Sequence, residues 1–323
     1  MGESSTHQHL EPNYGRRLIV NLVDEVAALD PSRPFVFVPR SSEPKDGWKP
    51  VTYREISNAV NYVAHDVSDK VQKKLQQEPF PTLAYIGPND IRYIIFELGC
   101  IKAGCKALFI SPRNSVQGQL SLFKATNCNF MFYDKSYESA VQLWLREREM
   151  RLIVVPSVNS WLQSSATPFP YSRTFDDAKW DPIVVFHTSG STGIPKPIVH
   201  RHGSYAISDA FHNMPDYQGA QFIMKEWMAR GKKVFLPMPL FHVAGCGFLI
   251  ISTVYYGAQI CLGIPDRPIS AELVAECLTP ADVDGAVLPP SILEELSLSD
   301  QGIEQLSKLS YVIFIGGRCF WRG

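Results

Sequence analysis

The residues best suited to chemistry in this sequence form a short loop near its middle. The loop reads TSGSTGIPK over residues 188–196 and combines small residues, hydroxyl side chains and one lysine. Glycines let the backbone turn sharply and bring its N–H groups close to a ligand. Backbone N–H groups and hydroxyls bind phosphate oxygens, and an ammonium group neutralises their charge. The loop therefore predicts a polyphosphate site made by Thr188, Ser189, Gly190, Ser191, Thr192, Gly193 and Lys196.

Two other interpretations, a Walker A motif and a flexible linker, fit the loop less well than a polyphosphate site of another kind. A Walker A loop places a Gly-Lys pair before its Ser or Thr, whereas Lys196 follows Pro195 here, so a P-loop kinase or GTPase is disfavoured. A flexible Ser/Gly linker would not need the prolines at the loop exit, nor the apolar run at 183–186 that leads into it. Because that run is short and rich in β-branched and aromatic residues, it predicts a buried strand.

His242 is the next candidate for chemistry. It lies in the sequence PLFHVAG, directly after a predicted strand at 234–237. A lone histidine is usually a core residue with satisfied ring nitrogens. The order Pro-Leu-Phe-His, followed by small residues that begin a helix, favours a position at a pocket instead.

The elements around these residues alternate between strand and helix. A capping box at Thr52 and Glu55, followed by apolar residues at helical spacing, predicts a long helix that reaches Leu75. Further helices are predicted at 18–28, 91–103, 116–125, 137–148, 204–213, 270–278 and 292–298. Strands are predicted at 35–38, 83–86, 107–110, 130–133, 152–155, 183–186, 234–237, 258–262, 285–288 and 309–315. This order predicts an α/β fold of mostly parallel sheets with helices on both faces.

Composition and charge restrict the class of protein. The 323 residues are 45% hydrophobic and 20% charged, as in ordinary soluble proteins. A formal net charge of −1 gives no electrostatic case for a nucleic-acid partner. The polar start and an odd number of cysteines, seven, without a Cys-x-x-Cys motif indicate a reducing compartment, so a cytoplasmic location is expected. Prolines and glycines break the uncharged stretch between Lys233 and Asp266, so no membrane span is expected. No zinc-type spacing occurs, so no metal-ligating residue is predicted.

The loop sequence TSGSTGxPK resembles the phosphate-binding loop of the AMP-forming adenylating enzymes. That superfamily includes acyl- and aryl-CoA synthetases, luciferases and the adenylation domains of nonribosomal peptide synthetases. The stretches at 51–56, 98–114 and 239–245 resemble further motifs of the family in the same order. The resemblance extends from Tyr14 to Gly317, and the N-terminal pattern is similar to that of fungal synthetase-like reductases, which join adenylation, carrier and reductase domains.

This resemblance implies a reaction in which a small carboxylic acid and ATP, with Mg²⁺, give an acyl-adenylate and pyrophosphate. The acyl group would then pass to CoA or to the phosphopantetheine of a carrier protein domain. Lys196 would be a catalytic cation beside the β- and γ-phosphates held by the loop. His242, the second expected catalytic residue, would line the carboxylate pocket with Phe241 and Gly245. Gly316 and Gly317, after the predicted strand at 309–315, would form the wall against which adenine lies.

Several motifs of the family pattern do not occur in this sequence. They are the Tyr-Gly-x-Thr-Glu stretch with its magnesium-binding Glu, the ribose-binding Asp, the hinge and the small C-terminal domain with its catalytic Lys. The expected organisation is a disordered tail at 1–13 and a truncated adenylation domain at 14–323. Two hypotheses remain open: an adenylating ligase or part of one, and an inactive remnant that binds nucleotide or a partner. The chain alone is expected to form no measurable acyl-adenylate.

The residue pair Phe241-His242 also restricts the substrate class. In amino-acid-activating members of the family the matching pair is Phe-Asp, whose carboxylate pairs with the α-ammonium group of the substrate. Burying an ammonium group without a counter-charge costs several kcal/mol, and no Asp or Glu occurs between Lys233 and Asp266. The sequence therefore predicts a carboxylic acid without an α-amino group: aryl, keto or fatty.

Overall fold

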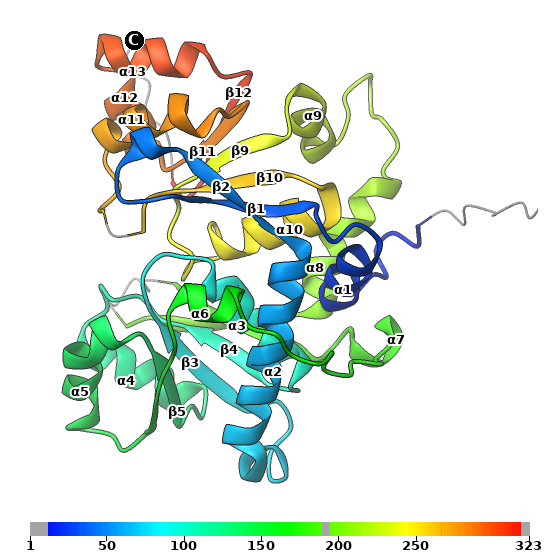
Figure 1. Ribbon diagram of the computed structural model, residues 1–323, viewed down its shortest axis with the longest axis vertical. Coiled ribbons are helices and arrows are strands. Elements are labelled where there is room, and N and C mark those ends of the chain that lie inside the picture. Colours follow the sequence, from blue (N-terminus) through cyan, green and yellow to red (C-terminus); the bar gives the residue numbers. More distant parts are fainter. Residues whose placement is uncertain (1–11, 189–193, 266, 318–323) are drawn as a thin grey trace, which may run out of the picture.

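The computed structural model describes residues 12–188, 194–265 and 267–317. Its framework is a pair of six-stranded sheets (Figure 1). The first sheet has the order β12-β11-β9-β10-β1-β2 and the second the order β6-β5-β3-β4-β7-β8. The strands of the first sheet are β1 (Pro34–Pro39), β2 (Trp48–Thr52), β9 (Lys233–Leu236), β10 (Gln259–Leu262), β11 (Gly285–Leu288) and β12 (Tyr311–Phe314). Those of the second are β3 (Thr82–Ile86), β4 (Lys106–Phe109), β5 (Phe130–Tyr133), β6 (Arg151–Val154), β7 (Pro182–Thr188) and β8 (Lys196–Arg201).

Both sheets are parallel except at one edge. Among the described strand pairs of the two sheets, only β1–β2 and β7–β8 are antiparallel, and in each sheet they lie at the edge. The carboxyl ends of the parallel strands therefore share one edge of each sheet, and this edge is where α/β proteins commonly bind ligands.

The helices form three layers around the two sheets. Between the sheets, a shared apolar core joins α1 (Ile19–Leu29), α2 (Tyr53–Leu75), α3 (Arg92–Lys102), α8 (His202–Ala210) and α10 (Cys246–Tyr256). The outer face of the second sheet is covered by α4 (Val116–Ala125) and α5 (Glu138–Leu145). The outer face of the first sheet is covered by α11 (Ala271–Ala281), α12 (Pro290–Leu296) and α13 (Asp300–Ser307). The remaining helices are α6 (Val158–Leu162), α7 (Phe175–Ala178) and α9 (Ile223–Arg230), with 3₁₀ turns η1 (Pro44–Asp46), η2 (Lys135–Tyr137) and η3 (Phe211–Asn213).

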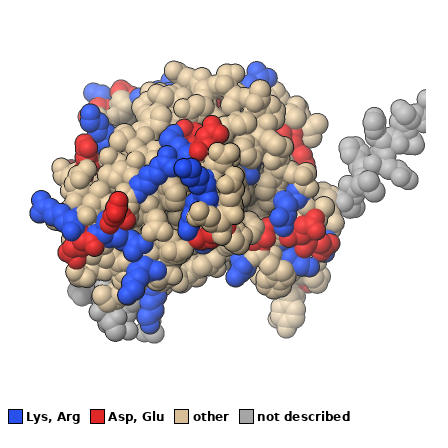
Figure 2. Space-filling view, turned by 90° about the horizontal axis from the view of Figure 1, so that it is seen from below, with Lys and Arg blue, Asp and Glu red and all other residues tan. Residues whose placement is uncertain are grey.

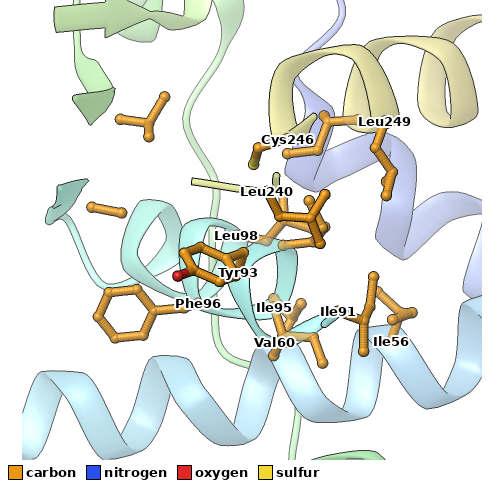
Figure 3. Packing of buried hydrophobic residues seen from close by; sticks show 14 of the residues in the cluster. Ile56, Val60, Ile91, Tyr93, Ile95, Phe96, Leu98, Leu240, Cys246 and Leu249 are labelled. Atoms are coloured by element: carbon orange, nitrogen blue, oxygen red, sulfur yellow. The ribbon is translucent and has the colours of Figure 1, made fainter. Parts of the chain in front are cut away.

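Alternation along the strands explains why each sheet carries helices on both faces. In β3, Leu83 and Tyr85 belong to the central core, whereas Ala84 and Ile86 pack on the opposite face with α4 and α5. Successive strand residues point to opposite faces, so a strand that is apolar throughout must be covered on both sides. Figure 3 shows the central layer, where side chains of α2, α3 and α10 interdigitate.

Basic and acidic side chains are interspersed on the surface. Figure 2 shows basic and acidic residues next to one another on the face seen from below. Ion pairs such as Lys74–Glu78, at 2.7 Å, neutralise charge locally. No helix in the described ranges is long and apolar enough to cross a bilayer.

The predicted α/β fold, with mostly parallel sheets and helices on both faces, is confirmed. The long helix also begins with the expected capping box, in which Thr52 and Glu55 exchange hydrogen bonds.

Two edge strands and several short helices differ from the sequence prediction. No strand was predicted between residues 38 and 83, but β2 begins at Trp48. The prolines after the phosphate loop indicate a stiff exit, yet Pro197 lies within β8, an edge strand, where a missing N–H is tolerated. Helices α6, α7, α9 and α13 were also not predicted.

Candidate active site

The candidate site lies where the carboxyl edges of the two sheets meet. His187 is in β7 of the second sheet, and His242 is in the connection between β9 of the first sheet and α10. Their ring centroids are 6.0 Å apart and the planes are inclined at 62°. One imidazole from each sheet therefore faces the other directly beside the start of the phosphate loop.

The two ends of the phosphate loop are held together by strand pairing. Thr188 at the end of β7 lies opposite Lys196 at the start of β8. Both side chains are exposed, and the ammonium group of Lys196 makes no hydrogen bond or ion pair with any other residue that the structure describes. The predicted ligands Ser189, Gly190, Ser191, Thr192 and Gly193 lie outside the described residues. An open hydroxyl and a free ammonium group at the loop ends fit a phosphate ligand.

The N-terminus of α4 packs against the loop exit. A Cβ built on Gly118 would lie 3.0 Å from the Cδ of Pro195, which is tighter than an ordinary contact. A side chain at position 118 would crowd Pro195, so the close contact with the first turn of α4 helps to fix the position of Pro195 and hence of Lys196.

His187 is held as a neutral imidazole. The backbone N–H of Ser111 donates to its Nε2 at 3.2 Å, so this nitrogen must be the acceptor and Nδ1 must carry the proton. Burial, followed by the neighbouring His242, lowers the pKa of His187 to about 4. No described residue forms a well-aligned hydrogen bond with the buried Nδ1, although the backbone of the adjacent Thr188 interacts with the ring and acts on the pKa of His187 in the opposite direction to burial. A buried N–H without a partner is costly, so His187 offers a donor to an anionic ligand.

His242 is held by a tight turn before α10. Its N–H donates to the Pro239 carbonyl at 3.1 Å, and its own carbonyl accepts from the N–H of Cys246 at 2.9 Å. The turn requires Gly245, because a Cβ there would lie 2.3 Å from the Pro239 oxygen. Phe241 packs beside the imidazole with ring centroids 4.5 Å apart. Burial, and secondly the positive charge of Arg113, lower the pKa of His242.

A cavity of about 140 Å³ lies behind the turn that carries His242. It opens at the carboxyl ends of β3, β4, β9 and β10, and its polar lining includes Asn89 and two arginines, Arg113 and Arg267. Arg267 is 3.5 Å from Glu276, whereas Arg113 is exposed and has no ion pair with another described residue. The positive charge of Arg113 acts on His242, which suits an acidic ligand.

Gly316 and Gly317 follow β12 on the same edge of the first sheet. Strand β12 is parallel to β11, which is parallel to β9, so the two glycines and His242 emerge on the same side, two strands apart. Gly316 has a φ of +108°, a conformation that favours glycine.

Metal ligands of the chain itself do not gather at this site. In residues 12–188, 194–265 and 267–317 there is no group of three or more His, Cys, Asp or Glu side chains that could hold a metal ion. A magnesium ion here would have to be held largely by the oxygens of a bound polyphosphate and by water, a common arrangement for this ion.

A comparison with protein families identifies the family to which this chain belongs. Residues 23–319 match the family model described as AMP-binding enzyme. The chain belongs to the AMP-binding enzyme family. This membership confirms the resemblance that the sequence TSGSTGxPK carries.

Two curated relatives and one solved structure extend this result. The AMP-binding chain is 48% identical to a carboxylic acid reductase of Neurospora crassa over 311 residues, which are 96% of this chain and 30% of that protein. It is 30% identical over 310 residues, 94% of its length, to an isocyanide synthase–NRPS hybrid of Aspergillus fumigatus, of which it spans 20%. The chain thus spans less than a third of either relative. The inhibitor-bound N-terminal domain of FACL13 from Mycobacterium tuberculosis has the same fold, with a TM-score of 0.69 at 20% identity over 93% of this chain and 70% of that one.

Sequence reasoning identified only part of this AMP-binding site. The structure brings Phe241, His242 and Gly245 into one turn, and it pairs Thr188 with Lys196. His187 and Arg113 were not predicted. His187 lies one residue before the loop, at the end of the strand. This position next to the predicted phosphate site is the feature of the sequence that could have identified it. The roles assigned to the named residues remain predictions.

Proposed function

We propose that this AMP-binding chain binds Mg-ATP and a carboxylic acid without an α-amino group, as the part of a longer adenylating ligase that activates the acid as an acyl-adenylate. The observation that carries the proposal is the pair of neutral imidazoles, His187 and His242, beside the phosphate loop and near the cation Arg113. This set of groups offers donors and a positive charge to an anionic substrate, and no negative charge to an ammonium group. The relative from Neurospora crassa is named a carboxylic acid reductase, which agrees with this substrate class.

The phosphate end of the proposed site is the loop between β7 and β8. Lys196 would neutralise negative charge on the β- and γ-phosphates, while Thr188 and the loop residues 189–193 would donate hydrogen bonds. Magnesium would neutralise further charge on the phosphate oxygens. Because no covalent enzyme intermediate is needed, positioning and charge stabilisation would provide the catalysis.

At the acid end, His242 would hold the substrate carboxylate close to the α-phosphate. A carboxylate oxygen attacks the α-phosphorus, the bond from that phosphorus to the bridging oxygen breaks, and pyrophosphate leaves with the electron pair. The Nδ1–H of His187, which has no well-aligned partner among the described residues, would donate to an oxygen of the acid or of the phosphate. Gly316 and Gly317, at the end of β12, would form part of the adenine wall.

The acceptor of the acyl group in this proposal is a thiol of CoA or of a carrier-bound phosphopantetheine. The cavity lined by Phe241 would offer the thiol an approach to the acid, and the chemistry of its lining suits either thiol.

The proposal can be tested with stable analogues of acyl-adenylates, in which a sulfamoyl group replaces the phosphate. Hydrocinnamoyl- and phenylalanyl-sulfamoyl-adenosine differ only by the α-amino group. Calorimetric titration of the chain should give tighter binding for the hydrocinnamoyl compound. Lys179→Ala, which removes a half-buried lysine paired with Asp176 before β7, should leave both affinities unchanged. Tighter binding of the phenylalanyl compound, or no binding of either, would overturn the proposal.

A further inference from the structure

We propose that Asn89 is a positioning residue for the acid end of the site, because its side chain fixes the backbone that carries Phe241 and His242. Asn89 lies in the loop after β3 in the second sheet, yet both of its hydrogen bonds reach the first sheet. Its Nδ2 donates to the Met238 carbonyl at 3.3 Å, and its Oδ1 accepts from the Leu240 N–H at 2.6 Å. The significance for acid binding rests on the function proposed above.

The orientation of the Asn89 amide follows from its partners. The Met238 carbonyl can only accept and the Leu240 N–H can only donate. A side chain that bonds to both backbone groups must carry one donor and one acceptor side by side. The amide of Asn carries both and is uncharged. Asp would place a second acceptor against the Met238 carbonyl, and Ala or Leu would leave both backbone groups without a partner.

Residues 238–240, which Asn89 contacts, make few other backbone hydrogen bonds. Strand β9 ends at Leu236, and Pro237 and Pro239 have no N–H with which to continue a ladder. The backbone polar groups on either side of Pro239 are the Met238 carbonyl and the Leu240 N–H. Both groups form hydrogen bonds with the Asn89 side chain, which therefore replaces the hydrogen bonds that a neighbouring strand would make.

Leu240 transmits this restraint to His242. It is fully buried and, as Figure 3 shows, it lies among side chains of α3 and α10, such as Leu98 and Cys246. His242 follows two residues later, inside the turn closed by its hydrogen bond to Pro239. If the Leu240 N–H loses its partner, the turn can shift and water can reach the imidazole. The restraint therefore acts on the orientation and burial of His242.

The state of His242 can be observed without enzymatic activity. Among the described residues, the charged or titratable groups that act on its ring are His187 and Arg113, and burial is the first cause of its lowered pKa. When the turn relaxes and the ring becomes hydrated, the pKa of His242 should rise toward the ordinary value of 6.5. His202, whose Nε2 is 3.0 Å from the Tyr171 hydroxyl, provides an internal reference in the same spectra.

The test compares Asn89→Ala and Asn89→Leu with the control Asn159→Ala. Asn159 lines a groove together with Asn89, but its side chain is exposed and makes no hydrogen bond with another described residue. Titration of imidazole resonances by NMR should give an upward shift for His242 in both Asn89 variants and no shift for His202. The Leu variant keeps most of the side-chain volume, so it separates lost hydrogen bonds from lost packing. An unchanged His242 pKa in a folded Leu variant would overturn the proposal.

A second readout links the restraint to ligand binding. Misplacing a binding group slightly can cost one to two orders of magnitude. The Asn89 variants should therefore bind hydrocinnamoyl-sulfamoyl-adenosine roughly tenfold more weakly and Mg-ATP almost as well as the unmodified chain. Equal loss of both affinities would indicate general damage and contradict the positioning role. If the unmodified chain bound neither ligand, the proposed function would fail, while the His242 titration would still decide the role of Asn89.

Discussion

Replacing His187 by Gln should make the stability of the protein less sensitive to acid. His187 is buried and neutral in the native state, where its pKa is about 4, whereas its unfolded value is near 6.5. Above pH 6.5 the ring is neutral in both states and its contribution to stability is complete. As the pH falls from 6.5 toward 4, the unfolded chain binds a proton that the native state does not, so stability is lost.

The size of this effect follows from the two pKa values. Between pH 7 and pH 5 the unfolded state gains a proton almost fully and the native state gains very little. The free energy of unfolding should therefore fall by about 2 kcal/mol on account of His187 alone. In the native protein the Ser111 N–H donates to Nε2 of His187. The side-chain oxygen of Gln can accept the same hydrogen bond, and Gln does not titrate.

Urea unfolding at both pH values measures the loss for each protein. Other buried histidines, such as His202, titrate in the same direction in both proteins and cancel from the difference. The unmodified chain should lose about 2 kcal/mol more than His187→Gln. Equal losses would show that His187 is protonated in the native state, which would refute the assignment of a neutral ring with its proton on Nδ1.

Three further predictions concern the loop, the turn and the substrate. Lys196→Ala combined with Gly193→Val should weaken Mg-ATP binding at least tenfold in calorimetry, because a charge-assisted contact contributes about 1.5–3 kcal/mol; an unchanged affinity would remove the loop from the site. Gly245→Ala should lower the free energy of unfolding by about 1–3 kcal/mol, since its Cβ would lie 2.3 Å from a backbone oxygen. Gly317→Ala, whose Cβ would make an ordinary contact at 3.6 Å, is the control and should change stability little. In competition binding, deaminated acids should displace the hydrocinnamoyl analogue better than the corresponding amino acids, and the reverse order would exclude the role given to His242.

The fold could be predicted from sequence because its signals are local. The capping box at Thr52, the apolar strands and the strand–helix alternation each follow from residues close together in the chain. The antiparallel edge strands could not be predicted in the same way. β2 and β8 contain prolines and exposed side chains, and only their pairing with a neighbouring strand makes them regular.

The predicted part of the site is likewise the part that is local in sequence. Phe241, His242 and Gly245 lie within five residues, and their turn can be read from one motif. The missed residues act across the two sheets. Asn89 reaches from β3 to the backbone after β9, and His187 meets His242 only because the carboxyl edges converge. No spacing in the sequence encodes these contacts, since they depend on how the two sheets pack.

The most direct test of the acid site is to follow the imidazole signals of His187 and His242 by NMR while hydrocinnamoyl-sulfamoyl-adenosine is added. If both rings face the acid, as the 6.0 Å separation of their centroids suggests, both signals should shift saturably with one common dissociation constant, while that of His202 should remain in place. Saturable binding that leaves both His187 and His242 unperturbed would contradict the location of the acid pocket.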